Sequence, residues 1–262
     1  MRALTLFTLI CFPAAAHAAL KTKSVEYRDG DTVLEGHLAW DDARVKPDTS
    51  APAVLIVHQW LGITDNERSR AAKLAESGLV AFACDIYGKG TRPKDANEAR
   101  QFSGKYKGDR QLFRRRVNLG LSELLKQTGV DSKRVAAIGY CFGGTGVLEL
   151  ARSGANVAGV VSFHGGLDFP TPTSGDWTRT KVLILHGADD PFVPVKDIEA
   201  FKNELNEAKV DWQMVYYSGA VHSFTQKEAG NDNSRGVAYN ENADRRSWAA
   251  MKSFFEETLG AK

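Results

Sequence analysis

The sequence is poor in cysteine, with only Cys11, Cys84 and Cys141 among its 262 residues. Scaffolds built on disulfides are dense in cysteine, so this number excludes that class of small secreted fold. The chain also lacks an apolar run of about 20 residues, the length that a helix needs to cross a bilayer. Its longest basic tract is the triplet at 114–116, and its 34 basic residues are nearly balanced by 32 acidic ones. We therefore expect no membrane-spanning segment and no nucleic-acid partner.

The length and composition fit one large soluble domain. The chain is 43% hydrophobic and 25% charged, and a chain of this length buries a core without disulfides or a metal. No internal repeat, low-complexity tract or linker divides it, and we interpret residues 170–175 as a surface loop. We expect a single domain over residues 19–262, with a monomer favoured although the oligomeric state stays open.

The first eighteen residues have the pattern of a secretory signal peptide. Arg2 supplies a positive start, residues 3–12 form an apolar run, and Ala16 and Ala18 frame a cleavage site before Ala19. This run is too short for a membrane anchor, and it leaves little room for a lipoprotein signal that ends at Cys11. We expect an exported protein, located in the bacterial periplasm.

Apolar strand-like runs alternate with amphipathic stretches along the rest of the chain. The continuous apolar run at 53–57 is typical of a strand buried on both faces. Further strands are predicted at 32–40, 79–84, 135–139, 157–163, 181–186 and 211–217. Helices are predicted at 65–78 with Asp65 as N-cap, at 109–127, from the glycines after Cys141 to about 153, at 195–206 and at 247–259. This order predicts an α/β fold with a mainly parallel central sheet and helices on both faces.

Residues 139–143, Gly-Tyr-Cys-Phe-Gly, join a predicted strand directly to a predicted helix. A nucleophile on such a sharp turn projects from the sheet edge, and its crowded backbone requires small neighbours, here Gly139 and Gly143. The helix N-terminus favours negative charge, which lowers the pKa of the Cys141 thiol and stabilises a developing oxyanion. Taken alone, the pentapeptide fits a buried, inert cysteine equally well.

Two later loops supply an acid and a base. Asp190 follows the strand predicted at 181–186, and His222 follows the strand predicted at 211–217. Nucleophile, acid and histidine in this chain order are typical of α/β-hydrolases. We therefore predict Cys141 as nucleophile, His222 as general base and then acid, and Asp190 as the group that orients the imidazole.

Together, four motifs resemble the dienelactone hydrolase (carboxymethylenebutenolidase-like) family. They lie at 84–88, 139–144, 190–194 and 219–224, and the resemblance runs from about residue 53 to the C-terminus. The resemblance implies an α/β-hydrolase fold and the same Cys–His–Asp triad, with no metal or organic cofactor. It also implies an oxyanion hole formed by the backbone N–H groups of Trp60 and Phe142.

Three positions depart from the family pattern. The family's glutamate, which takes part in activating the thiol, falls on Gln59, and one of two arginines that bind the substrate carboxylate falls on Gln226. The other arginine falls on Lys89, which keeps the charge but loses the bidentate fork. We therefore expect direct activation of the thiol by the histidine, and a substrate other than dienelactone.

The expected substrate contacts are mostly aromatic. Besides Gln59 and Lys89 they include Tyr87, Phe192 and Phe224. They favour an uncharged or weakly charged ester, lactone or thioester.

The remaining histidines and Cys84 have simpler interpretations. His37 is expected at the surface, whereas His58 and His164 end strands at the catalytic edge and are candidates for the pocket wall. In the family's fold the strand that ends near His58 separates Cys84 from Cys141, so the resemblance predicts a buried Cys84 without a disulfide. No histidine spacing fits a metal site.

Three functions remain to be compared. The first is hydrolysis of a small ester or lactone through an acyl–Cys141 intermediate. The second is a non-catalytic binding protein for a small apolar ligand, which the changes at Gln59 and Gln226 would allow. The third is a redox-sensing thiol, which is disfavoured because no resolving cysteine is near Cys141 in the sequence.

Overall fold

The computed structural model describes residues 20–169, 177 and 180–261. The predicted signal peptide at 1–18 and the predicted surface loop at 170–175 lie outside these described residues. Among the helices that are described, none is long and apolar enough to cross a membrane.

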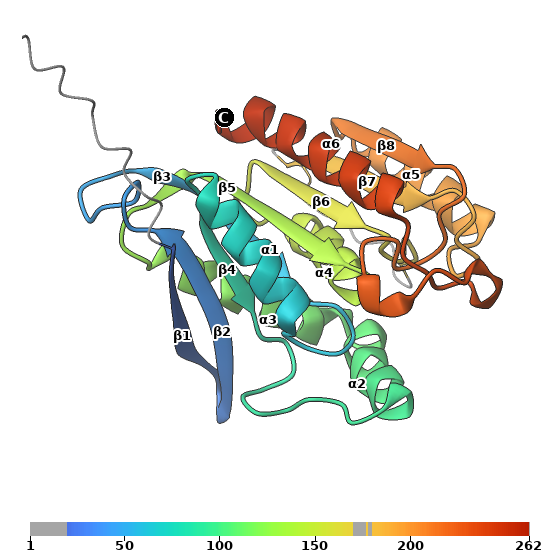
Figure 1. Ribbon diagram of the computed structural model, residues 1–262, viewed down its shortest axis with the longest axis horizontal. Coiled ribbons are helices and arrows are strands. Elements are labelled where there is room, and N and C mark those ends of the chain that lie inside the picture. Colours follow the sequence, from blue (N-terminus) through green and yellow to red (C-terminus); the bar gives the residue numbers. More distant parts are fainter. Residues whose placement is uncertain (1–19, 170–176, 178–179, 262) are drawn as a thin grey trace, which may run out of the picture.

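A single eight-stranded sheet forms the centre of the molecule (Figure 1), with the strand order β1-β2-β4-β3-β5-β6-β7-β8. The strands are β1 (Leu20–Asp29), β2 (Thr32–Asp41), β3 (Ala51–Val57), β4 (Val80–Cys84), β5 (Val130–Tyr140), β6 (Gly159–Phe163), β7 (Lys181–Gly187) and β8 (Trp212–Tyr217). The hairpin of β1 and β2 is antiparallel and β2 pairs antiparallel with β4, whereas every pair from β4 to β8 is parallel. The carboxyl ends of six strands therefore lie at one edge, where α/β proteins place their sites.

Helices cover both faces of this sheet, which confirms the predicted α/β class. They are α1 (Asp65–Glu76), α2 (Ala96–Gly108), α3 (Arg110–Leu125), α4 (Phe142–Arg152), α5 (Val195–Glu207) and α6 (Glu241–Leu259). Buried side chains of α1 and α6 belong to one core cluster, and those of α3, α4 and α5 belong to the other. Two short 3-10 helices, Lys227–Ala229 and Asn233–Arg235, lie between β8 and α6.

Strand β3 shows why the sheet needs two layers of helices. Leu55 and Val57 point into the core on the α3 and α4 side, whereas Val54 and Ile56 point to the α1 and α6 side. Since successive side chains of a strand alternate between faces, a continuous apolar run is satisfied only when both faces are covered.

Several predicted boundaries and one predicted exposure were wrong. Thr64, not Asp65, caps α1: its side chain accepts from Asn66 N–H, and Glu67 reaches back in a capping box. Helix α6 begins at Glu241, six residues before the predicted start, and β1 and α2 were not predicted. His37 is buried and not at the surface, because Arg68 lies over it with Nη1 3.0 Å from Nδ1.

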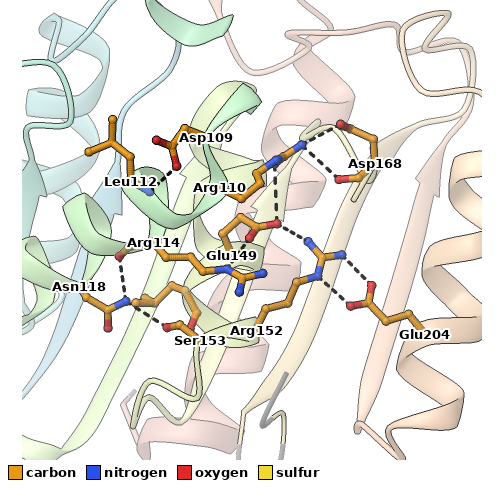
Figure 2. A network of polar contacts seen from close by, with 11 residues as sticks. Asp109, Arg110, Leu112, Arg114, Asn118, Glu149, Arg152, Ser153, Asp168 and Glu204 are labelled. Carbon is orange, nitrogen blue, oxygen red and sulfur yellow. Dashed lines mark hydrogen bonds and ion pairs between the residues drawn. The ribbon is translucent and has the colours of Figure 1, made fainter. Parts of the chain in front are cut away.

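A network of buried ion pairs fastens α4 to its neighbours (Figure 2). Glu149 of α4 accepts from Arg114 of α3 and from Arg152, at 2.7 Å each, and Arg110 lies 3.7 Å away. Arg152 also makes two hydrogen bonds to Glu204 of α5, at 2.8 and 2.7 Å. The helix that follows Cys141 is therefore held by α3 on one side and by α5 on the other.

Candidate active site

Cys141 lies on the sharp turn between β5 and α4. Its φ of 53° is in the left-handed region, which residues with a side chain rarely adopt. A Cβ on Gly139 would lie 1.9 Å from the carbonyl oxygen of Gly143, and one on Gly143 would lie 2.1 Å from that of Val57. Both positions therefore require glycine, because neighbouring backbone atoms lie too close for a side chain. The two glycines allow the sharp turn that presents the thiol at the sheet edge.

The side chains of Cys141, His222 and Asp190 form one chain of contacts. His222 Nε2 is 3.0 Å from Cys141 Sγ, and His222 Nδ1 donates to Asp190 Oδ2 at 2.8 Å. Asp190 follows β7 and His222 follows β8, so neighbouring parallel strands bring together residues that are far apart in sequence. A carboxylate behind one ring nitrogen leaves the other free to exchange a proton with the thiol.

The surroundings of Cys141 and His222 favour the charged form of both side chains. Burial alone would raise the pKa of the Cys141 thiol, but the positive charge of His222 and its hydrogen bond lower it below the ordinary value. Burial alone would likewise lower the pKa of His222, but the Cys141 charge and the hydrogen bond to Asp190 raise it to about 10. Both shifts favour a thiolate beside an imidazolium.

The two residues expected to supply the oxyanion hole, Trp60 and Phe142, both lie beside the candidate nucleophile. Phe142 is the first residue of α4, and its N–H helps to lower the pKa of the thiol. Trp60 lies in the loop after β3, and its carbonyl accepts from the Tyr87 hydroxyl at 2.9 Å. Both residues line a small cavity of about 160 Å³ together with Cys141 and His222.

His164 supports the turn instead of lining the pocket. Cys141 N–H donates to His164 Nδ1 at 3.2 Å, and His164 Nε2–H donates to Thr225 Oγ1 at 2.8 Å. Its position has a φ of 40° and is fully buried, and burial keeps the pKa well below its ordinary value. The neutral ring therefore ties the nucleophile turn to the loop that carries His222.

His58 has a comparable structural role. Its Nδ1–H donates to the Gln59 carbonyl at 2.6 Å, and its Nε2 accepts from Ile86 N–H at 3.2 Å. Burial lowers its pKa, which agrees with a neutral ring whose two nitrogens are both engaged. The ring joins the loop after β3 to the loop after β4.

A larger cavity of about 720 Å³ also opens beside the thiol. Cys141, His222, Trp60 and the half-exposed Phe192 belong to its wall, as does Gln59. Two of the predicted substrate contacts, Gln59 and Phe192, thus lie next to the candidate nucleophile.

The other three predicted contacts lie elsewhere. Lys89 pairs with Glu26 of β1 and Glu35 of β2, and it belongs to the wall of neither cavity. Tyr87 is buried under Trp60 against Phe142, and Phe224 is buried against His164. Tyr87 and Phe224 shape the site from behind its surface, because neither belongs to the wall of the two cavities.

The structure adds two cations that the sequence did not indicate. Lys107 lines the small cavity and helps to lower the pKa of the Cys141 thiol, and it also lies 3.6 Å from Asp168. Arg100 lines the larger cavity. Both belong to α2, whose polar sequence contains no motif, so only the fold of this helix over the site reveals them.

Neither described cysteine forms a disulfide. Val57 of β3 pairs with Cys84 on one side and with Gly139 on the other, so β3 separates Cys84 from the nucleophile turn as predicted. Within the described part of the chain, no group of three or more His, Cys, Asp or Glu side chains could hold a metal ion.

Comparisons with known proteins identify the family of this chain. The model of the dienelactone hydrolase family matches residues 41–259. The solved structure named m3DLH is 38% identical, with a TM-score of 0.87, and covers 92% of this chain and 99% of its own. A structure described as a dienelactone hydrolase-like promiscuous phosphotriesterase from metagenomic libraries is 39% identical, with the same coverage and a TM-score of 0.86.

One relative is described as a lactonase. A Bradyrhizobium protein described as a probable 2-oxo-3-(5-oxofuran-2-ylidene)propanoate lactonase is 27% identical over 79% of this chain and 86% of its own. The family match covers most of the chain and includes β3 to α6 with the whole candidate site. The chain belongs to the dienelactone hydrolase family and is a hydrolase that acts on esters or lactones.

Proposed function

We propose that this hydrolase cleaves a small ester or lactone through a covalent acyl intermediate on Cys141. The observation that carries the proposal is the continuous contact from Asp190 through His222 to the Cys141 sulfur, at 2.8 and 3.0 Å, at the wall of a large cavity. A site that only binds a ligand has no use for a carboxylate behind the imidazole.

In the first step the Cys141 thiolate attacks the substrate carbonyl carbon, and the carbonyl electron pair moves to oxygen. The N–H groups of Trp60 and Phe142 donate to this oxyanion. The intermediate then collapses, the bond to the leaving oxygen breaks, and that oxygen takes the proton from His222 Nε2. An acyl thioester on Cys141 and a neutral alcohol result.

In the second step His222 acts as a base. It takes a proton from water, the resulting hydroxide attacks the thioester carbonyl, and the Cys141 sulfur leaves as thiolate beside the imidazolium. Asp190 holds the imidazole in the tautomer that both steps need. The acid product departs and the resting pair is restored.

Activation of the thiol proceeds directly through the histidine. Gln59 carries no charge and cannot accept a proton at neutral pH, so it does not activate the thiol as a carboxylate would. The 3.0 Å contact between His222 Nε2 and the sulfur supports transfer without an intermediate group.

The substrate is proposed to be other than dienelactone. Gln226 provides no charge for a carboxylate, and Lys89 is already paired with Glu26 and Glu35 outside the cavities. The walls favour an uncharged or weakly charged acyl group.

The test compares turnover by wild type, Cys141→Ala and Cys84→Ala on short-chain nitrophenyl esters and simple lactones. Wild type and Cys84→Ala are expected to turn over at least one of them, whereas Cys141→Ala loses activity by at least about a thousandfold, as nucleophile removal does elsewhere. Cys84 is a matched control, because it is a buried thiol whose pKa is raised by burial and by Asp85. Rapid-quench mass spectrometry should find the acyl group on Cys141.

Equal activity of wild type and Cys141→Ala would overturn the covalent mechanism. Ligand-dependent thermal shifts that occur without turnover, and that persist in His222→Ala, would favour a binding protein instead. An aryl dialkyl phosphate belongs in the same panel, because one of the similar structures is described as a phosphotriesterase. Multiple turnover of this probe that is lost in Cys141→Ala would extend the proposed activity to phosphotriesters, whereas a single phosphorylation of Cys141 without release of dialkyl phosphate would only be inhibition.

A further inference from the structure

Two cavities of unequal size meet at the candidate nucleophile. Cys141, His222, Trp60 and Phe192 belong to the walls of both, so these residues lie where the two cavities adjoin. The larger cavity measures about 720 Å³, within the range of about 300–1,000 Å³ that is usual for small-molecule sites. The smaller cavity measures about 160 Å³, which is room for about five water-sized groups. A substrate that lies across the thiol therefore has one short arm and one long arm.

The larger cavity lies on the side of the leaving oxygen. After attack by Cys141, the former carbonyl carbon carries the oxyanion, the leaving oxygen and the acyl group. The leaving oxygen takes its proton from His222, and the loop that carries His222 contributes Ser223 and Gln226 to the larger cavity only. Val237, whose backbone pairs with that of His222, belongs to the same wall. The alcohol part of an ester is therefore directed into the larger cavity.

The smaller cavity lies on the side of the oxyanion hole. Its wall contains Phe142 and Thr145 from the first turn of α4, and Ser103 and Lys107 from α2. The hydroxyls of Thr145 and Ser103 donate to backbone carbonyls, at 3.0 and 2.8 Å. The Lys107 ammonium lies 3.6 Å from Asp168. Because these polar groups already have partners, the cavity suits a short acyl chain that has no polar group of its own.

The larger cavity is mostly apolar, with charges only where its wall meets solvent. Besides Cys141, its apolar wall residues are Trp60, Leu61, Phe192, Ala229 and Val237. The charged side chains of its described wall, apart from the candidate triad, are those of Asp65, Arg100 and Glu228, and all three are exposed. Exposed charges stay hydrated at the mouth, so the interior is left to hydrocarbon or aromatic groups.

We infer that the preferred substrate is an ester of a short acid and a large apolar alcohol, with its acyl group in the smaller cavity and its alcohol in the larger one. This inference rests on the proposed ester hydrolysis and narrows its substrate class. An ester with the same atoms arranged the other way, as a long acid and a smaller alcohol, should be a poor substrate. Its acyl chain exceeds the smaller cavity, and its alcohol fills less of the larger one.

Two isomeric esters distinguish these arrangements in the wild-type protein. 4-Butylphenyl acetate carries its chain on the alcohol, whereas phenyl hexanoate carries its chain on the acid. The kcat/KM for 4-butylphenyl acetate should be at least about tenfold higher, since a single methylene group in a fitted pocket is worth about tenfold or more. Each value is divided by the rate of hydroxide-catalysed hydrolysis of the same ester, which corrects for intrinsic reactivity. Chromatography measures the phenol that is released.

Two variants that fill one cavity each test the assignment of the arms. Ser103→Leu narrows the smaller cavity and should lower about tenfold the ratio of kcat/KM for phenyl butanoate to that for phenyl acetate. Ala229→Leu narrows the larger cavity and should lower by a similar factor the ratio for 4-butylphenyl acetate to phenyl acetate. Each variant should leave the other ratio unchanged. A partial loss of folded enzyme cancels, because both ratios are internal to one protein.

The matched controls make the same changes outside both walls. The exposed Ser122 of α3 donates to a carbonyl four residues before it, as Ser103 does in α2, so Ser122→Leu is the control for Ser103→Leu. Ala200→Leu, on the exposed side of α5, is the control for Ala229→Leu. Both ratios should keep their wild-type values in these controls.

The inference is overturned, and the proposed function kept, if wild type hydrolyses phenyl acetate but does not prefer 4-butylphenyl acetate over its isomer. Unchanged ratios in both cavity variants, or effects exchanged between them, would overturn it as well. The isomer comparison needs no variant, so it decides the inference even if a cavity variant fails to fold. A wild type that hydrolyses none of the esters would overturn the proposed function, and the inference with it.

Discussion

The charge on the Cys141 sulfur depends mainly on one neighbouring residue, His222. Burial opposes the thiolate, and the positive charge and hydrogen bond of His222 more than compensate for it. Cys84 lacks such a neighbour, so burial and the nearby Asp85 raise the pKa of its thiol. Two buried cysteines of one protein thus differ in reactivity because only one contacts an imidazolium.

Alkylation of the protein by iodoacetamide should reveal this difference in its dependence on pH. The pKa of Cys141 is lowered, so its reaction should continue below the ordinary thiol pKa of about 8.5. In His222→Ala the imidazolium is lost while burial remains, so the midpoint of the pH profile of alkylation should move above about pH 8.5, the ordinary thiol pKa. The measurement is the rate of adduct formation at Cys141 from pH 5 to 10, followed by mass spectrometry of the peptide.

Asp190→Asn is the companion variant, because the Asp190 carboxylate helps to raise the pKa of His222. The midpoint of its alkylation profile should lie between the midpoints of wild type and His222→Ala. A midpoint that is the same in all three proteins would contradict the ion-pair account of the site.

At the scale of elements, the turn between β5 and α4 depends on backbone contacts that only glycine permits. The would-be Cβ of Gly143 lies 2.1 Å from the Val57 carbonyl oxygen and 2.7 Å from that of His58. These atoms belong to β3 and the loop after it, so a side chain would push α4 away from the loop that carries Trp60.

Gly143→Ala is therefore expected to destabilise the fold by at least about 1–3 kcal/mol, the usual cost of overpacking. The matched control is Gly104→Ala in α2, where no atom lies within 4 Å of the would-be Cβ. This control should gain about 0.5–1 kcal/mol, because alanine is favoured over glycine within a helix. Urea unfolding of both variants measures the difference in the free energy of unfolding. Equal unfolding midpoints would show that the close approach of backbone at Gly143 has no effect on stability.

Elements with a strong apolar pattern were predicted, and those without one were missed. The strands β3, β4 and β6 are almost wholly buried and read as continuous apolar runs. In contrast, β1 has only two buried residues, Val25 and Tyr27, and α2 buries only Ala99 and Tyr106. Periodicity arises from burial on one face, so elements that bury little leave almost no pattern in the sequence.

At the scale of the whole molecule, Glu149 connects helices that come from distant parts of the chain. Its side chain is 1% exposed and contacts Arg110 and Arg114 of α3 as well as Arg152, which continues the network to Glu204 of α5. A buried carboxylate with several guanidinium partners is tolerated only because its charge is compensated.

Glu149→Gln should therefore lower the free energy of unfolding by about 3–5 kcal/mol, because it leaves buried guanidinium groups without their counter-charge. The control is Lys126→Gln, which removes an exposed ion pair with Glu123 and should cost at most about 1 kcal/mol. Chemical denaturation of both proteins provides the measurement. A loss in Glu149→Gln no larger than that of the control would mean that the network adds nothing to stability.

The sequence by itself determined the α/β class, the central strands and the order of Cys141, Asp190 and His222, because these depend on local apolar runs and on turns that follow strands. Only the tertiary structure decided which side chains meet. In the folded protein Lys89 pairs with Glu26, and Lys107 of α2 lies at the site. Both ring nitrogens of His58 and of His164 make hydrogen bonds. These outcomes depend on strand order and on helix placement over the sheet edge, which arise from packing between segments far apart in the chain and leave no local signal.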